Sequence, residues 1–154
     1  GQVHAALMTN QNVADGDALA KLLDQIPREE QIDVIGGDGA YDTKPCHAAI
    51  AARSAIPSIP PREGAVHWPA DMPGAAWRNG AVDAISSDSR REWKQDSSYH
   101  RRSLAENAMY RFKTRTGHCL WARHIDSQAT EISVRVGVIN CMANLARPQS
   151  VRIA

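Results

Sequence analysis

The chain has 154 residues, of which 43% are hydrophobic and 23% are charged, and its net charge is +1. This length and composition suit one domain with a core and exclude a chain that is disordered by composition. Three widely spaced cysteines without a CxxC pair argue against a disulfide framework and a zinc ribbon. No apolar run approaches the roughly 18 residues of a membrane span, so we expect a cytoplasmic protein with no membrane partner.

The charge is unevenly distributed along the chain. Residues 1–50 contain 3 basic and 8 acidic residues, whereas residues 90–125 contain 9 basic and 3 acidic residues. Acidic residues followed by a basic segment suit a protein that binds a metal ion with carboxylates and DNA with arginines. A pair of solvated charged helices would produce the same imbalance, and charge alone does not choose between the two interpretations.

The first part of the chain predicts alternating strands and helices, which is typical of an α/β sheet. The expected strands cover Gln2–Thr9, Ile32–Gly36 and Ala55–Ile59, and the expected helices cover residues 17–26 and 43–54. Apolar residues recur at helical spacing in the first of these helices. Its Asp17 is interpreted as a cap or first-turn acid rather than a metal ligand.

Asp38 follows a predicted strand within the sequence GDGAYD, residues 37–42. An acid at the carboxyl end of a strand is well placed to meet a ligand, because α/β sheets bind ligands at that edge. The alternative is a plain turn in which Asp38 caps its own backbone. Asp42 is expected to cap the following helix together with Thr43.

Residues 57–79 form a predicted irregular insertion, since five of the eight prolines lie between positions 57 and 73. Arg62 in this insertion is a candidate for contacting a phosphate group. His67 and Trp68 are candidates for stacking on DNA bases. The simpler interpretation is an irregular loop packed on the protein surface.

The sequence of residues 80–146 predicts a C-terminal part made of helices. The expected helices cover residues 80–95, 99–115 and 127–146, with Asn79 capping the first, Gly117 ending the second and Pro148 ending the third. Trp121–Arg123 is expected to be a short extended link. The flank of the middle helix is expected to face a core through Leu104, Ala105, Ala108, Met109 and Phe112.

Four residues of the middle helix have a notable spacing: Tyr99, Arg102, Glu106 and Lys113. On an α-helix these positions return to nearly one direction, within about 40° of Glu106. A carboxylate flanked by two cations can hold a divalent metal and a phosphodiester together. The alternative is an ordinary Arg102–Glu106 pair on a solvated helix face.

The spacing Tyr-x2-Arg-x3-Glu-x6-Lys resembles the signature of bacterial insertion-sequence transposases of the DDE class. GDGAYD and the IPPR of residues 59–62 resemble two further motifs of that family. The resemblance implies an α/β fold with an RNase H-like mixed sheet flanked by helices. It implies that Asp38 and Glu106 bind Mg²⁺ or Mn²⁺ and act in catalysis, and that DNA is contacted by Tyr99, Arg102, Lys113 and Arg62.

The family uses three acids, and this chain has no aspartate or glutamate before Asp15. We therefore expect the C-terminal part of a transposase catalytic domain, truncated at its N-terminus and weak or inactive as it stands. Its expected function is metal-dependent DNA cleavage and strand transfer at insertion-sequence ends, with double-stranded DNA and other transposase subunits as partners. The alternatives are a non-catalytic remnant that binds DNA or full-length transposase, and a general metal-dependent nuclease.

Overall fold

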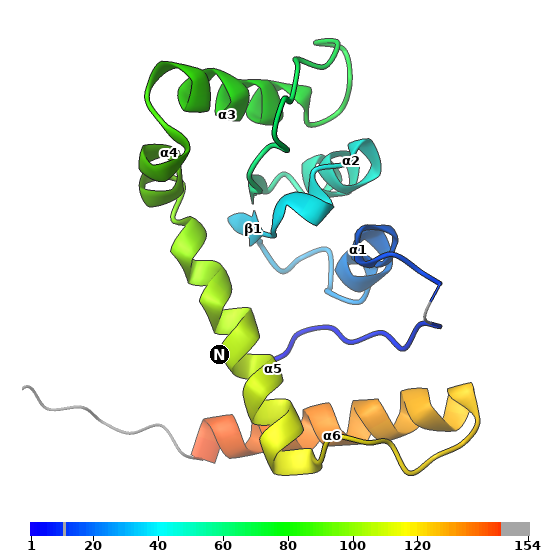
Figure 1. The fold of residues 1–154 in the computed structure, drawn as a ribbon. Helices are drawn as coiled ribbons and strands as arrows, with labels where there is room; N and C mark the ends of the chain where they lie inside the picture. Colours follow the sequence, from blue (N-terminus) through cyan, green and yellow to red (C-terminus); the bar gives the residue numbers. More distant parts are fainter. Residues whose placement is uncertain (11, 146–154) are drawn as a thin grey trace, which may run out of the picture. The chain divides into compact units, whose positions relative to one another are not determined.

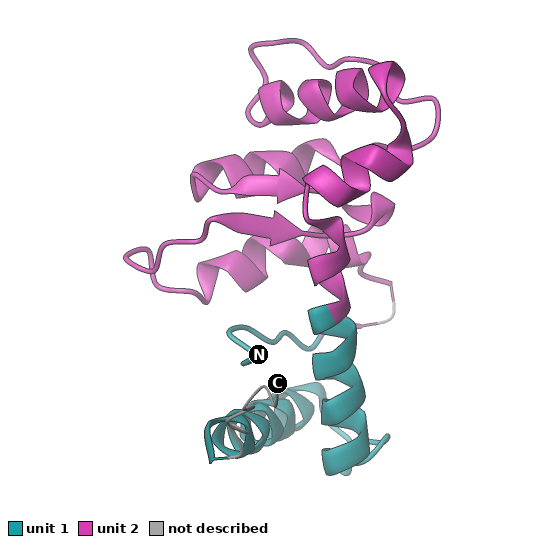
Figure 2. Ribbon diagram, turned by 90° about the vertical axis from the view of Figure 1, so that its left-hand side faces the viewer, with its two compact units in different colours: residues 1–8, 104–154 teal, residues 9–103 magenta. Residues whose placement is uncertain are grey.

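The computed structural model describes residues 1–10 and 12–145 (Figure 1). The chain divides into two compact units (Figure 2), unit 1 with residues 1–8 and 104–154 and unit 2 with residues 9–103. The described residues are mostly helical, with a small parallel sheet in unit 2. No helix in this part of the chain is long and apolar enough to cross a membrane.

Unit 2 alternates helices and short strands through its first half and is helical in its second half. Its elements are α1 (Asp15–Asp24), β1 (Val34–Gly36), the 3-10 helix η1 (Gly39–Tyr41), α2 (Lys44–Ala52), β2 (Ile56–Ser58), α3 (Ala75–Ser87), α4 (Arg90–Asp96) and the 3-10 helix η2 (Tyr99–Arg102). The helices and strands predicted between residues 17 and 59 are therefore confirmed, with shorter strands than expected.

The sheet of unit 2 pairs β1 with β2 in parallel, with Val34 opposite Ile56, Ile35 opposite Pro57 and Gly36 opposite Ser58. Helix α2 connects the two strands along the chain, which is the βαβ connection that parallel strands require. Pro57 lacks a backbone N–H but is tolerated because the residues on either side of it, Ile56 and Ser58, make hydrogen bonds to Asp33 and Gly37 beside β1. Only these two strands occur in the described residues, so the mixed sheet of an RNase H-like fold stays a prediction.

The core of unit 2 lies between α1, α2 and the start of β2. It consists of apolar side chains from these elements, namely Leu19, Leu23, Cys46, Ile50, Ala55 and Ile59. Helix α1 packs against α2, as the helical spacing of its leucines predicts. Cys46 and His47 are both fully buried.

Arg53, at the end of α2, holds the chain that leaves α1. Its guanidinium donates to four carbonyl oxygens, those of Leu23 at 2.9 Å, Ile26 at 2.7 Å, Pro27 at 2.8 Å and Glu30 at 3.0 Å. Leu23 lies in the last turn of α1, where a cation interacts favourably with the negative end of the helix dipole, and the other three carbonyls belong to the chain after the helix.

The helix predicted over residues 80–95 is two helices in the structure. Helix α3 begins at Ala75, and a new helix, α4, starts after Ser89, whose side chain accepts from Glu92 N at 3.2 Å and donates to Glu92 Oε2 at 2.8 Å. Ser89 is therefore the N-cap of α4, and this local start signal ends α3 and begins a new helix. Asn79 lies inside α3 and is not its cap, so that prediction is wrong.

The cap of α3 is Gly74, which has φ +81°. A Cβ atom at this position would lie 2.7 Å from the carbonyl oxygen of His47. Glycine is required here both by the positive φ and by the close approach of α2, and tertiary packing therefore sets where α3 begins.

Unit 1 contains α5 (Ser103–Thr116), α6 (Ile125–Leu145) and the N-terminal segment. The strand predicted at residues 2–9 is wrong within the described residues. The side-chain amide of Asn140 on α6 accepts from Val3 N and donates to Val3 O, both at 2.8 Å. This amide takes the place of a neighbouring strand, because it satisfies both polar groups of one extended residue.

Helix α5 ends as predicted, because Gly117 has φ +94° and its N–H donates to Lys113 O at 3.0 Å. The predicted core-facing flank is only partly correct. Leu104 and Met109 are 55% and 54% exposed, whereas Phe112 is half-buried. Helix α6 buries Ile139 at its centre. The predicted helix stop at Pro148 lies outside the described residues.

We predict that Arg53→Ala lowers the free energy of unfolding by about 2 kcal/mol, because four carbonyls, two of them in part-buried hydrogen bonds, lose a charged donor. Urea denaturation followed by circular dichroism measures the change. The control is Arg28→Ala, which removes an exposed ion pair of 3.7 Å with Asp24 and should change stability by less than about 0.5 kcal/mol. Equal effects of the two substitutions would contradict the role assigned to Arg53.

Candidate functional site

The candidate site of unit 2 lies at the carboxyl ends of β1 and β2. Asp38 follows β1 by two residues and is exposed. Its Oδ1 accepts from Ala40 N at 2.9 Å, which makes Asp38 the cap of η1. The capping role considered for Asp38 is therefore present, and its carboxylate also stands where α/β sheets meet their ligands.

Ser58, the last residue of β2, links the Asp38 loop to the segment before η2. Its carbonyl accepts from Gly37 N at 3.2 Å, and its hydroxyl donates to Ser97 O at 3.0 Å. Ser58 is 3% exposed, so these bonds are shielded from water. Helix η2 itself packs against β1. The structure thus brings Asp38 and the Tyr99–Arg102 turn to the same end of the sheet.

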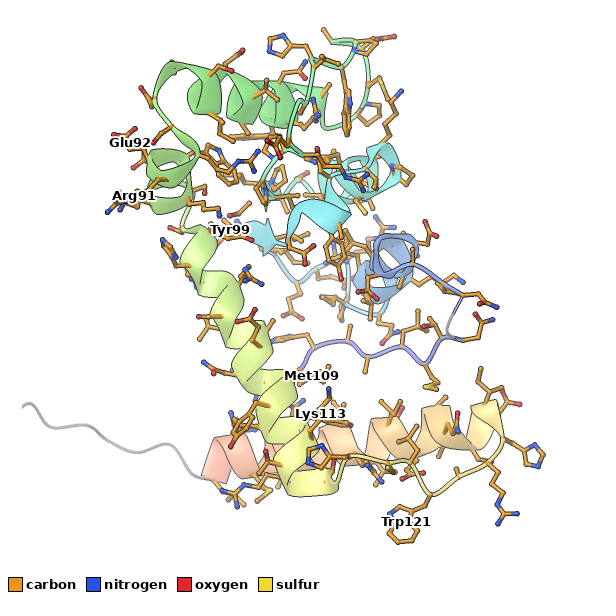
Figure 3. The ribbon with its side chains drawn as sticks, in the orientation of Figure 1. Arg91, Glu92, Tyr99, Met109, Lys113 and Trp121 are labelled. Atoms are coloured by element: carbon orange, nitrogen blue, oxygen red, sulfur yellow. The ribbon has the colours of Figure 1, made fainter. Side chains whose placement is uncertain are left out.

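Tyr99 and Arg102 lie in the 3-10 helix η2, because the α-helix begins only at Ser103 (Figure 3 labels Tyr99). Side chains three residues apart eclipse one another in a 3-10 helix. The Cζ atom of Arg102 accordingly lies 5.3 Å from the centre of the Tyr99 ring, and Lys94 Nζ lies 5.1 Å from it. The ring also packs against Trp93, so Tyr99 positions two cations by cation–π contacts.

Arg62 lies against the Asp38 loop. Its Nε donates to Gly39 O at 3.2 Å and its Nη2 donates to Ala40 O at 3.3 Å. Its backbone N–H donates to Asp42 Oδ2 at 2.9 Å. The residue predicted to contact phosphate therefore holds the backbone next to Asp38 and keeps further N–H groups of its guanidinium for other acceptors.

Glu106 and Lys113 belong to unit 1, in the first and last turns of α5. Both are exposed. Two turns separate them, so they share one face of the helix. A carboxylate in the first turn is favoured by the helix dipole, as is an ammonium group in the last turn.

The carboxylates of Asp38 and Glu106 have the oxygen chemistry that Mg²⁺ and Mn²⁺ prefer. However, residues 1–10 and 12–145 contain no group of three or more His, Cys, Asp or Glu side chains that could hold a metal ion. The donor type of each carboxylate therefore fits a divalent metal.

Sequence reasoning missed a buried ion pair behind this site, between Asp42 and Arg78. Asp42 does not cap α2, since Thr43 does so through its side chain. Arg78 Nε instead donates to Asp42 Oδ1 at 3.1 Å, and the two side chains are 4% and 2% exposed. His47 Nε2 lies 3.3 Å from the same oxygen. The two partners are 36 residues apart, and no local pattern links them.

This ion pair also holds the proline-rich insertion. The Arg78 guanidinium donates to Val66 O and lies 4.3 Å from the centre of the Trp68 ring. Asn79 fixes the Trp68 backbone by accepting its N–H at 2.9 Å and donating to its carbonyl at 2.8 Å. The Trp68 ring also meets His47 edge-on. The insertion is irregular, as predicted, and Trp68 uses its ring for contacts inside unit 2.

The environment of Asp42 favours its charged form. Burial alone would raise the pKa of this carboxyl group, but the contacts with His47 and Arg78 and the N–H of Arg62 hold its pKa well below the usual 3.8. A carboxylate with a lowered pKa stabilises the fold above its unfolded pKa, and this contribution is lost as pH falls toward the folded pKa.

We predict that Asp42→Asn lowers the free energy of unfolding by about 3 kcal/mol at neutral pH, because it leaves the Arg78 charge buried without its counterion. The difference in the free energy of unfolding between the variant and the unchanged protein should shrink as pH falls below about 4. Urea denaturation at a series of pH values measures this dependence. Asp71→Asn, at an exposed position, is the control and should cost little at any pH. A difference that grows at acidic pH would contradict the assignment.

We compared the chain with models of protein families and with solved structures. The family model described as the transposase DDE domain matches residues 1–141 of the chain. No solved structure matches the chain.

Proposed function

Because the chain belongs to the transposase DDE domain family, we propose that it acts in DNA transposition, by metal-dependent cleavage of DNA strands at insertion-sequence ends and their transfer to target DNA. The observation that supports this proposal most directly is the arrangement at the carboxyl ends of β1 and β2. There the Asp38 loop, Arg62 and the Tyr99–Arg102 turn are joined through Ser58 and Asp42.

The proposal assigns metal binding to Asp38 and Glu106. The family generally uses divalent metal, and we favour Mg²⁺ or Mn²⁺ because both candidate ligands are carboxylates. When bound, such ions would activate the attacking hydroxyl group and stabilise the leaving oxygen. The three-acid signature of the family requires one more carboxylate than these two residues supply.

The proposal assigns the DNA contacts to cations of both units. Arg102, oriented by the Tyr99 ring, and Lys113 on α5 would neutralise phosphate oxygens. Arg62 would use the N–H groups that do not hold the Asp38 loop. These roles need no base recognition, so they would position any DNA sequence.

A second candidate is a non-catalytic protein that binds DNA or other transposase subunits. The excess of nine basic over three acidic residues between positions 90 and 125 favours this alternative, because binding to DNA phosphates needs no metal site. It would keep the basic residues but supply no catalysis.

We predict saturable binding of Mn²⁺ to the purified chain in a calorimetric titration, weakened roughly ten-fold or more by either Asp38→Asn or Glu106→Gln. Charge count sets affinity at sites built from oxygen ligands, so each substitution should matter. Asp71→Asn and Glu63→Gln remove one charge each from exposed positions of unit 2 and should leave the affinity unchanged.

Loss of binding in both variants would place the two acids in one site. If a folded chain binds no Mn²⁺, the non-catalytic alternative replaces the proposed function. If only one substitution weakens binding, the two acids do not share a metal.

A further inference from the structure

The loop between α5 and α6, residues 117–124, is held rigidly although it has no regular structure. Glu131 on α6 accepts from Trp121 N through both carboxylate oxygens, at 3.1 and 3.0 Å, and from Ala122 N at 2.9 Å. Gln128 donates to Ala122 O at 3.0 Å. Both polar groups of Ala122 are thus satisfied by one face of α6, which fixes the path of the loop.

A second layer of bonds fixes Glu131 itself. Arg135, one turn further along α6 and 8% exposed, donates to Glu131 Oε1 and to Cys119 O, the latter at 2.9 Å. The N–H of Ala122 foremost, and after it the contacts with Trp121 and Arg135, lower the pKa of Glu131, so the carboxylate stays charged in this position. The loop therefore has a defined backbone before any partner arrives.

This rigid loop displays a tryptophan. Trp121 is 89% exposed, more than any other large hydrophobic side chain in the described part of the chain. Figure 3 shows its ring pointing away from the ribbon. Binding is favoured by any partner that covers the face of an indole ring held in water, because apolar surface is then buried. A backbone that is already ordered reduces the conformational entropy lost on binding.

Most charged residues near Trp121 in the sequence are basic, although Asp126 follows in the first turn of α6. Residues 113–124 contain three Lys or Arg, two His and no acid. The three cations, Lys113, Arg115 and Arg123, are all exposed. Glu131, the acid that touches the loop, is already paired with Arg135. An exposed aromatic ring with exposed cations close to it in the chain is a combination that suits single-stranded nucleic acid, which is bound through base stacking and phosphate contacts.

We propose that Trp121 is a stacking platform for an unpaired DNA base and that Arg123 and Arg115 hold the adjoining phosphates. The faces of bases are covered inside a duplex, so this platform would favour single-stranded or frayed DNA over intact duplex. The inference rests on the proposed function, which makes DNA the substrate, and adds a contact that neither metal ligand supplies.

The test is fluorescence anisotropy with a labelled single strand of about 16 nucleotides and with its duplex, in chelator, so that metal binding plays no part. Trp121→Ala should weaken single-strand binding by roughly ten-fold or more and duplex binding much less. Trp121→Phe keeps a stacking ring and should bind nearly as well as the unchanged chain. Trp77→Ala removes a tryptophan of unit 2 that is 54% exposed and should have no effect.

Salt dependence separates stacking from charge. Measured between about 50 and 200 mM salt, the slope of log affinity against log salt should be unchanged in Trp121→Ala and smaller by about 0.7 in Arg123→Gln. Because Trp121 and Arg123 are both exposed, neither Trp121→Ala nor Arg123→Gln should alter the circular dichroism spectrum.

Several outcomes would overturn the inference. It fails if Trp121→Ala binds the single strand as the unchanged chain does, or if it weakens both DNA forms equally. It also fails if sedimentation shows that the substitution abolishes self-association while DNA binding persists, since the face would then be a protein interface. If the unchanged chain binds neither DNA form, the proposal that DNA is the substrate fails too. If the chain binds DNA and only the Trp121 substitution has no effect, the proposed function stands.

Discussion

The arrangement of unit 2 depends on the buried ion pair between Asp42 and Arg78. Transferring either charge alone into the interior would cost several kcal/mol, so neither side chain can leave the other without a large penalty. The carboxylate also accepts the backbone N–H of Arg62, and the guanidinium also donates to Val66 O. One interaction therefore ties together the start of α2, the proline-rich insertion and α3, and through Arg62 it reaches the loop of Asp38.

Unit 1 uses the same physical device at a different place. Glu131 and Arg135 form an ion pair on α6, and both also make hydrogen bonds to backbone groups of the 117–124 loop. Irregular segments bury few apolar side chains, so their backbone groups must find other partners. In both units a charged pair supplies them. The result is two preorganised loops that carry exposed polar, cationic or aromatic groups, which is favourable for binding a polyanion such as DNA.

The two tryptophans beside these pairs have opposite roles for a physical reason. Trp68 lies over the guanidinium of Arg78 and meets His47 with its ring, so its faces are used within unit 2. Trp121 donates its backbone N–H to Glu131, and its ring stays in water. Sequence reasoning offered Trp68 either base stacking or packing on the protein surface, and it placed Trp121 in a short extended link. The contacts of the two rings and of the loop backbone come from residues that a sequence pattern does not connect.

Local signals in the sequence were sufficient for the family and for most of the regular elements. The spacing of Tyr99, Arg102, Glu106 and Lys113 and the motif around Asp38 pointed to the transposase DDE domain, and the leucines of α1 and the glycine after α5 predicted helices that the structure contains. These features depend on residues close together in the chain, where spacing, caps and turn residues act directly.

Only the tertiary structure decided the features that join distant parts of the chain. The Asp42–Arg78 pair spans 36 residues, and Asn140 replaces a strand partner for Val3 across 137 residues. The start of α3 at Gly74 follows from the approach of His47. In each case the deciding energy comes from satisfying a buried charge or backbone group, or from avoiding a steric clash, and the partner that does so is determined by how the chain folds back on itself.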